Sequence, residues 1–143
     1  MFRRAYGLLL IVLLLGAGCG RGRESGPKVT GRLLIDGQPC HPANTYDFDL
    51  KFLTVEGEGL SKRSYLAEVQ TDGTFTLNGS MGKGIPVGQY KISIIGKIVG
   101  EDGKPTGRYL SQFSDKATPL EVNIVDETKE ITIDLAKKTA TTS

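Results

Sequence analysis

Acidic side chains offer the most obvious candidates for chemistry in this chain. Asp47 and Asp49 alternate with apolar residues, so on an extended segment both carboxylates lie on one face, about 7 Å apart. Such a pair could hold a calcium ion together with a loop carbonyl, or it could belong to a solvated face. Glu101 and Asp102 lie in a glycine-rich loop, but the ligand spacing of an EF-hand is absent. We prefer the solvated interpretation and predict no metal site.

Nucleophilic chemistry has little support in the residue pattern. Cys40 and His41 are adjacent, and adjacent residues on an extended chain point to opposite faces, so a thiol–imidazole pair is geometrically awkward. A single histidine also argues against a zinc site. The sequence contains no G-x-S-x-G motif, no Ser-His-Asp order and no phosphate-binding loop. We therefore predict no enzymatic activity and no cofactor, and keep a hydrolase only as a third hypothesis.

An apolar run near the N-terminus stops at a cysteine. Arg3 and Arg4 precede the run Leu8–Leu15, and three small residues, 16–18, lie between the run and Cys19. This is the layout of a secretory signal with its cleavage site. The run is too short for a spanning helix, because eight residues reach roughly 12 Å against a hydrocarbon core of about 30 Å.

The sequence GAGC resembles a bacterial lipobox, in which the cysteine thiol is diacylated and the residue becomes the new N-terminus; Gly16 departs from the usual aliphatic residue. The resemblance implies a lipoprotein signal peptide at 1–18, a lipidated Cys19 and a flexible tether over 19–27. A plain secretory signal and a retained membrane anchor are the alternatives. Gly20 after the cysteine resembles the outer-membrane sorting pattern. We expect an exported, lipid-anchored protein that faces the periplasm or the cell surface, in the outer membrane of a two-membrane bacterium.

The chain that follows the signal is electrically balanced. Arg3 and Arg4 are two of the 18 basic residues, whereas all 16 acidic residues follow Cys19, so the mature chain has no formal net charge. This balance argues against nucleic acid as a partner and against a purely electrostatic association with membranes. If Cys19 is acylated, Cys40 has no partner within the chain. We predict a buried, apolar Cys40 thiol, with an intermolecular disulfide or a reactive thiol as alternatives.

Alternation of apolar and polar residues predicts strands through the rest of the chain. The clearest case is YDFDLKF, in which Tyr46, Phe48, Leu50 and Phe52 fall on one face. The seven predicted strands are residues 29–35, 46–52, 64–69, 74–77, 89–95, 120–125 and 130–135. Asp-Gly pairs at 36–37 and 72–73 supply tight turns between strands. We predict an all-β, seven-stranded Greek-key β-sandwich in which two sheets bury their apolar faces.

Three motifs carry a resemblance to a known family. VTGRLLIDGQP, VQTDGTFTL and PVGQYKISI occur in that order. They resemble the pattern of bacterial lipoproteins, many of planctomycete type, with a carboxypeptidase regulatory-like domain, and the ending FSDKATPLEVNIV…ITIDL is similar to their last two strands. The resemblance covers 28–135, leaves 136–143 as a polar tail and implies a transthyretin-like (prealbumin-like) sandwich. Tyr90 would point inward with its hydroxyl bonded to nearby backbone. Cys40 and the longer loop Lys97 to Arg108 depart from the pattern.

The enzymes of the transthyretin-like group hydrolyse hydroxyisourate with several histidines, an arginine and a C-terminal Y-R-G-S, whereas this chain has only His41 and ends TATTS. We therefore predict a non-catalytic cell-envelope protein. Its sandwich would serve as a structural or protein-binding module, its partners being the bilayer, through acylated Cys19, and an unknown envelope protein or glycan. The alternative is a glycan- or solute-binding accessory module with Tyr65, Tyr109 and Asp102 as candidate contacts; core or edge packing is the other interpretation of the two tyrosines. The absence of Trp counts against this alternative.

Overall fold

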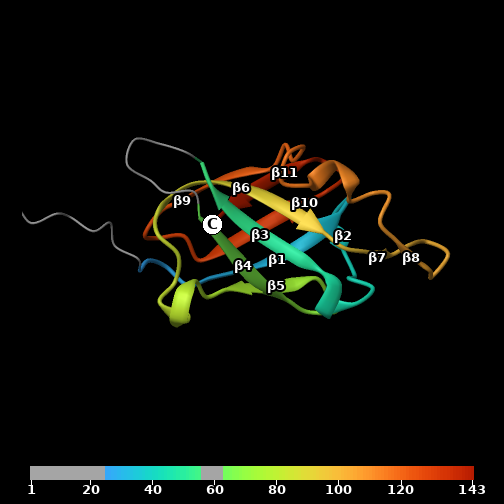
Figure 1. Ribbon diagram of the computed structural model, residues 1–143, viewed down its shortest axis with the longest axis horizontal. Helices are drawn as coiled ribbons and strands as arrows, with labels where there is room; N and C mark the ends of the chain where they lie inside the picture. The colour runs from blue at the N-terminus through green and yellow to red at the C-terminus, as the bar shows by residue number, and fades with distance from the viewer. Residues whose placement is uncertain (1–24, 56–62) are drawn as a thin grey trace, which may run out of the picture.

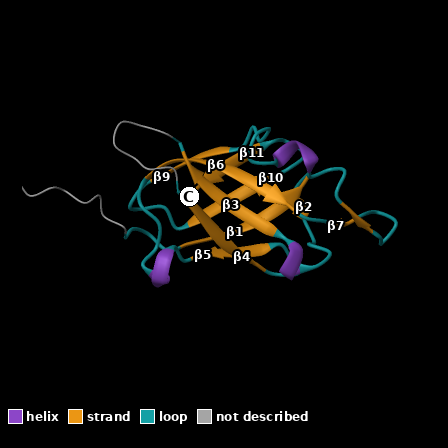
Figure 2. Ribbon diagram, in the orientation of Figure 1, coloured by secondary structure: helices purple, strands orange, loops and turns teal. Residues whose placement is uncertain are grey.

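The computed structural model describes residues 25–55 and 63–143, and these residues form mainly strands and loops (Figure 1). The strands are β1 Val29–Ile35, β2 Gln38–Pro39, β3 Asp49–Thr54, β4 Ser64–Val69, β5 Thr74–Leu77, β6 Gly88–Ile95, β7 Ile98–Val99, β8 Pro105–Thr106, β9 Glu121–Ile124, β10 Glu130–Asp134 and β11 Thr139–Thr142. Short 3₁₀ turns lie between them at η1 Thr45–Asp47, η2 Ser80–Gly82 and η3 Ser111–Phe113 (Figure 2). The all-β class predicted from the sequence is confirmed.

One large mixed sheet makes up the body of the described domain. Its strand order is β11-β10-β1-β5-β4-β3-β6-β9, and β2 pairs with β1 beside this path. Strands β1 and β10 run parallel, and their neighbours along the path pair antiparallel. The sheet curls until its edge strands β9 and β11 lie side by side, so the fold is nearly a closed barrel. The β7–β8 hairpin projects from one end of it (Figure 1).

The predicted strands agree with the observed ones at most positions. β1, β4 and β5 match the predicted ranges, and β6, β9 and β10 differ from them by one residue at their ends. The prediction for 46–52 is wrong in its first half. The Asn44 side chain accepts a hydrogen bond from the Tyr46 backbone N–H at 3.0 Å and begins η1, so β3 starts only at Asp49. Tyr46, expected to face inward, is 94% exposed.

The sheet also continues beyond Leu135, where the last predicted strand ended. β11 lies within the segment 136–143 that was expected to be a polar tail, and it pairs antiparallel with β10. The backbone of Ser143 bonds to the backbones of Lys129 and Glu130 and holds the end of the strand in place. Because β11 consists of small and mostly polar residues, it has no alternation that could mark it as a strand.

Aromatic rings from four strands meet in the interior. Phe52 of β3 lies 6.1 Å from Phe75 of β5 and 6.4 Å from Tyr90 of β6, measured between ring centroids. Tyr65 of β4 lies 6.1 Å from Tyr90 in an edge-on arrangement. Since β3 and β5 are not neighbours in the sheet, these rings join its two halves across the core. Edge-on and tilted ring pairs stabilise a core beyond the area they bury.

The glycine in VTGRLLI is required by packing. Gly31 pairs with Ile131 of the parallel strand β10. A Cβ at this position would lie 2.3 Å from the Ile131 carbonyl oxygen and 2.3 Å from Cζ of Phe75. Both distances are far inside van der Waals contact, so only glycine lets β1 approach the neighbouring backbone and the Phe75 ring this closely.

The turn between β1 and β2 is bonded to the last residue of β10, Asp134. Asp36 and Gly37 both have positive φ, 51° and 77°, which is the backbone of a type I′ hairpin turn. Their backbone N–H groups donate to the Asp134 carboxylate at 3.2 and 3.1 Å. The same carboxylate accepts from the backbone N–H groups of Ala136 and Lys137 at 3.1 and 3.2 Å. The buried Asp134 therefore links two turns that are remote in sequence.

The Tyr90 side chain behaves as the sequence predicts. Its ring is buried and its hydroxyl donates a hydrogen bond of 2.6 Å to the carbonyl oxygen of Pro86.

Tyr90→Phe removes the donor but keeps the ring, so we expect the free energy of unfolding to fall by about 1 kcal/mol. Urea unfolding measures this change. The exposed Tyr46→Phe is the matched control and should leave the midpoint unchanged; equal midpoints for all three proteins would contradict the prediction.

Candidate functional site

The residues named as candidates from the sequence do not come together. Cys19 lies outside the described residues. Tyr65 is only 6% exposed and packs against Tyr90, so it offers no ring to a ligand and its prediction as an exposed contact is wrong. The alternation in SYLAEV contained the signal for this, because it places Tyr65 on the same face as Ala67 and Val69, both buried.

Tyr109 and Asp102 have structural surroundings. Tyr109 is partly buried, and its ring centroid lies 6.3 Å from that of Phe113 in η3. Burial raises the pKa of the Tyr109 hydroxyl, and the nearby Asp134 carboxylate adds to the rise. Asp102 is exposed near the tip of the β7–β8 hairpin, where Oδ1 accepts a hydrogen bond of 3.0 Å from the Lys104 backbone N–H. Its carboxylate therefore stabilises its own loop.

The two aspartates that could have formed a cation site have separate partners. Asp47 accepts a hydrogen bond from the Asn44 side chain at 2.9 Å. Asp49 forms an ion pair with Lys51 across 3.3 Å on β3. In residues 25–55 and 63–143, no three side chains of His, Cys, Asp or Glu gather where a metal ion could bind.

Cys40 is the buried thiol that the sequence predicts. It is 1% exposed, and burial raises the pKa of its thiol to about 11. At neutral pH the group is therefore protonated and shielded, which makes it a poor nucleophile. The exposed His41 has a different contact, since its Nδ1 lies 3.0 Å from the Thr71 carbonyl oxygen.

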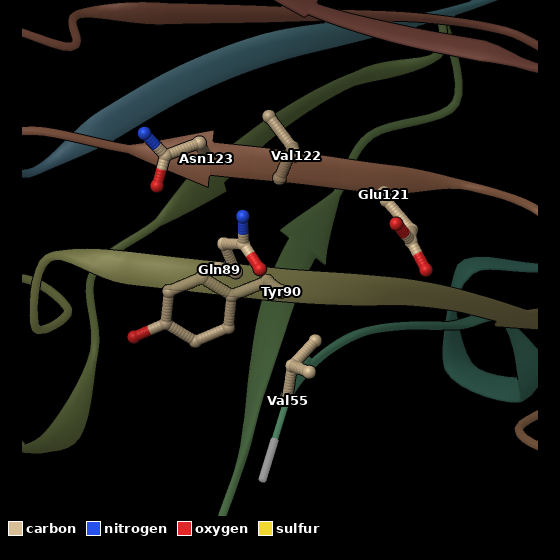
Figure 3. A pocket seen from close by; sticks show the side chains of 6 residues that line it. All are labelled: Val55, Gln89, Tyr90, Glu121, Val122 and Asn123. Carbon is tan, nitrogen blue, oxygen red and sulfur yellow. The ribbon is translucent and has the colours of Figure 1, made fainter. Parts of the chain in front are cut away.

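A small pocket opens beside the edge strand β9 (Figure 3). Its volume is about 140 Å³, which is below the usual range of small-molecule sites, roughly 300–1,000 Å³. Its lining residues are Val55, Gln89, Tyr90, Glu121, Val122 and Asn123. The Tyr90 hydroxyl is already bonded to Pro86, so the polar groups left in the lining are one carboxylate and two amides. This set provides no nucleophile and no acid–base pair.

Exposed apolar side chains occur at both ends of the barrel. We call the end formed by η1 and the β7–β8 hairpin the distal end; it exposes Tyr46, Ile95 and Val99. We call the end formed by residues 78–87 and Val125 the entry end, because the described chain begins beside it (Figure 1). The exposed ring of Tyr46 was not predicted from the sequence. The Asn44-x-x-Asp47 spacing, which allows a side-chain cap, was the available signal.

These surfaces are the candidate sites that the geometry supports. None of the helical turns in the described part of the chain has the length and hydropathy of a bilayer-spanning helix. Comparison of the chain with protein-family models, curated proteins and solved structures gives no match.

Proposed function

We propose that this protein is a non-catalytic, lipid-anchored component of a bacterial cell envelope. The observation that carries the proposal is the order of segments: Arg3 and Arg4, the apolar run Leu8–Leu15, small residues, and Cys19. Acylation of Cys19 would hold the protein at a bilayer, since two or three acyl chains give stable attachment where one is marginal. The protein would face the periplasm or the cell surface, in the outer membrane where there are two membranes.

We also propose that the domain is a Greek-key sandwich of the transthyretin-like type, closed at one corner by β4. Residues 64–67 of β4 pair with β3, whereas Glu68 and Val69 pair with β5. The strand thus passes from the layer β3-β6-β9 to the layer β5-β1-β10. The ring contact between Phe52 and Phe75 supports two facing layers, because it crosses the core between them.

The distal end is the surface we assign to a protein partner. It lies away from the point where the described chain begins (Figure 1), so a tethered domain would present it to the surroundings. A glycan partner is the second candidate, and the exposed ring of Tyr46 favours it, because sugars stack on exposed aromatic faces. Retention on purified cell-wall glycan that is lost in Tyr46→Ala would select the glycan; binding to envelope protein without such retention would select the protein partner.

Cys19→Ala tests the anchor. In a bacterium fed labelled palmitate, the protein with its natural sequence should carry label and sediment with membranes, because the sulfur of Cys19 carries the acyl chains. We expect the label on Cys19→Ala to fall at least tenfold, to background. Labelled Cys19→Ala protein should therefore be absent from the membrane fraction. Cys40→Ala is the matched control and should carry as much label as the protein with its natural sequence. Equal labelling of Cys19→Ala and of the natural sequence would refute acylation at Cys19.

A further inference from the structure

We propose that the entry end of the domain lies directly on the bilayer, with the side chain of Met81 inserted among the lipid head groups. This inference rests on the proposed lipid anchor at Cys19 and specifies how the anchored domain is oriented. It commits to a lipid surface as the occupant of the exposed apolar side chains at this end.

The point where the described chain joins the domain fixes which end is near the lipid. The Gly26 backbone N–H donates to the Lys83 carbonyl oxygen at 3.1 Å, and the Ile85 N–H donates to the Pro27 carbonyl oxygen at 3.1 Å. Packing here is tight, since a Cβ on Gly84 would lie 2.0 Å from the Gly26 carbonyl oxygen. Five residues lie between Cys19 and Ser25, so the six steps from one Cα to the next span at most about 20 Å. Residues 83–85 are therefore held near the anchor.

Met81 occupies an unusual place at this end. Its φ of 55° and ψ of 29° lie in the left-handed region, which residues other than glycine and asparagine rarely adopt. The flanking Gly79 and Gly82 also have positive φ, and together they form the tight turn that contains η2. The Met81 side chain is 91% exposed, so it contributes little to the core. A strained backbone that displays a flexible apolar side chain is a feature to explain by function.

Two more exposed apolar residues belong to the entry end. Val87 directly precedes Gly88 and Val125 directly follows Ile124, and Gly88 pairs with Ile124. The two valines are 51% and 43% exposed. Exposed lysines at positions 28, 83 and 129 can approach lipid phosphates, while the exposed Asp126 and Glu127 limit the net positive charge. The apolar side chains, rather than charge, therefore account for the preference for a lipid surface.

Position-specific fluorescence in vesicles tests this orientation. The mature protein, isolated from membranes of the producing bacterium, is reconstituted in phosphatidylcholine–phosphatidylglycerol vesicles as Met81→Cys, Val87→Cys or Tyr46→Cys, each labelled with an environment-sensitive dye. Acylated Cys19 and buried Cys40 leave the introduced cysteine as the reactive thiol. Nitroxide-bearing lipids should quench dyes at positions 81 and 87 at least threefold more than a dye at position 46, which lies on the distal end.

The outcomes separate the orientation from the anchor. Protein that floats with the vesicles but shows equal quenching at positions 81, 87 and 46 would overturn the orientation and leave the anchor intact. Protein that does not float with the vesicles at all would overturn the anchor, and the orientation with it. Strong quenching at position 87 supports the orientation even if the Met81→Cys substitution disturbs its strained turn.

Discussion

Asp134→Ala should lower the free energy of unfolding by about 3 kcal/mol. The carboxylate is 6% exposed and accepts four backbone N–H groups, from Asp36, Gly37, Ala136 and Lys137. Alanine leaves these donors without an acceptor at the point where two turns meet, and hydrogen bonds to a charged group are among the stronger ones. Urea unfolding measures the loss as a lower midpoint with an unchanged slope.

Two further variants separate the carboxylate from its ion pair. Lys137→Ala removes the ammonium that lies 3.6 Å from Asp134 Oδ2, but it keeps all four backbone hydrogen bonds. Because the Lys137 side chain is exposed, we expect a loss of no more than about 0.5 kcal/mol. Asp134→Asn keeps the shape and one acceptor oxygen, so its loss should fall between the other two. If Lys137→Ala cost as much as Asp134→Ala, the ion pair would be the stabilising element.

The same carboxylate gives stability a defined pH dependence. Burial by itself raises the pKa of Asp134, but the backbone hydrogen bonds from Lys137, Asp36 and Gly37, with the Lys137 charge, outweigh it and lower the pKa below the ordinary value of 3.8. A carboxyl group with a lowered folded-state pKa stabilises fully above its unfolded pKa. The contribution is lost as pH falls through the folded value. The stability difference between unmodified protein and Asp134→Asn should therefore be constant at neutral pH and shrink below pH 3.8.

Gly31→Ala should destabilise the domain by about 2–3 kcal/mol through overpacking. The added Cβ meets the Ile131 carbonyl oxygen at 2.3 Å and the Phe75 ring at the same distance. The ring could shift by a small rotation, but the oxygen belongs to the backbone of β10, so β1 and β10 must separate. Thermal or urea unfolding measures the loss.

Gly37→Ala is the control that separates steric conflict from backbone strain. Gly37 has a φ of 77°, yet a Cβ there would meet nothing within 4 Å. Its substitution should therefore cost only the strain of a positive φ, about 1 kcal/mol. Gly31→Ala added to Phe75→Leu should still lower stability relative to Phe75→Leu alone, because the conflict with Ile131 persists. A Gly31→Ala protein as stable as the unmodified one would show that the strands separate without cost.

Alternation in the sequence predicted most strands because each has one buried and one exposed face. In β4 the pattern is regular enough to give both bounds. It also places Tyr65 on the buried face with Ala67 and Val69, although Tyr65 was predicted as an exposed contact. The hydrogen bond from the Tyr90 hydroxyl to nearby backbone was also predictable, since Tyr90 follows Pro86 and Gly88 at the start of a clear strand. Where a local hydrogen bond competes with the strand, alternation fails, as it does at Tyr46, whose backbone is capped by Asn44.

Other features depend on contacts between remote segments and had no local signal. Asp134 occupies one position of an alternating strand, and nothing near it in sequence indicates that it will accept hydrogen bonds from a turn 98 residues away. Alternation of apolar and polar residues is the same in both chain directions, so it cannot indicate that β1 and β10 run parallel. The exposed surface at Met81 results from backbone torsions in a glycine-rich turn, which composition alone does not determine.

The parallel pairing of β1 with β10 has a consequence for the order of folding. β1 lies between β5 and β10, and its register pairs Thr30 with Glu130 and Leu34 with Asp134. This central strand therefore cannot complete its pairing until a segment about a hundred residues later in the chain has been synthesised. Such high contact order slows folding, because a long loop must close before the contact forms. During synthesis the domain therefore stays incomplete until its last quarter emerges, and the export proposed above would need the chain to cross a translocation channel in such an unfolded state.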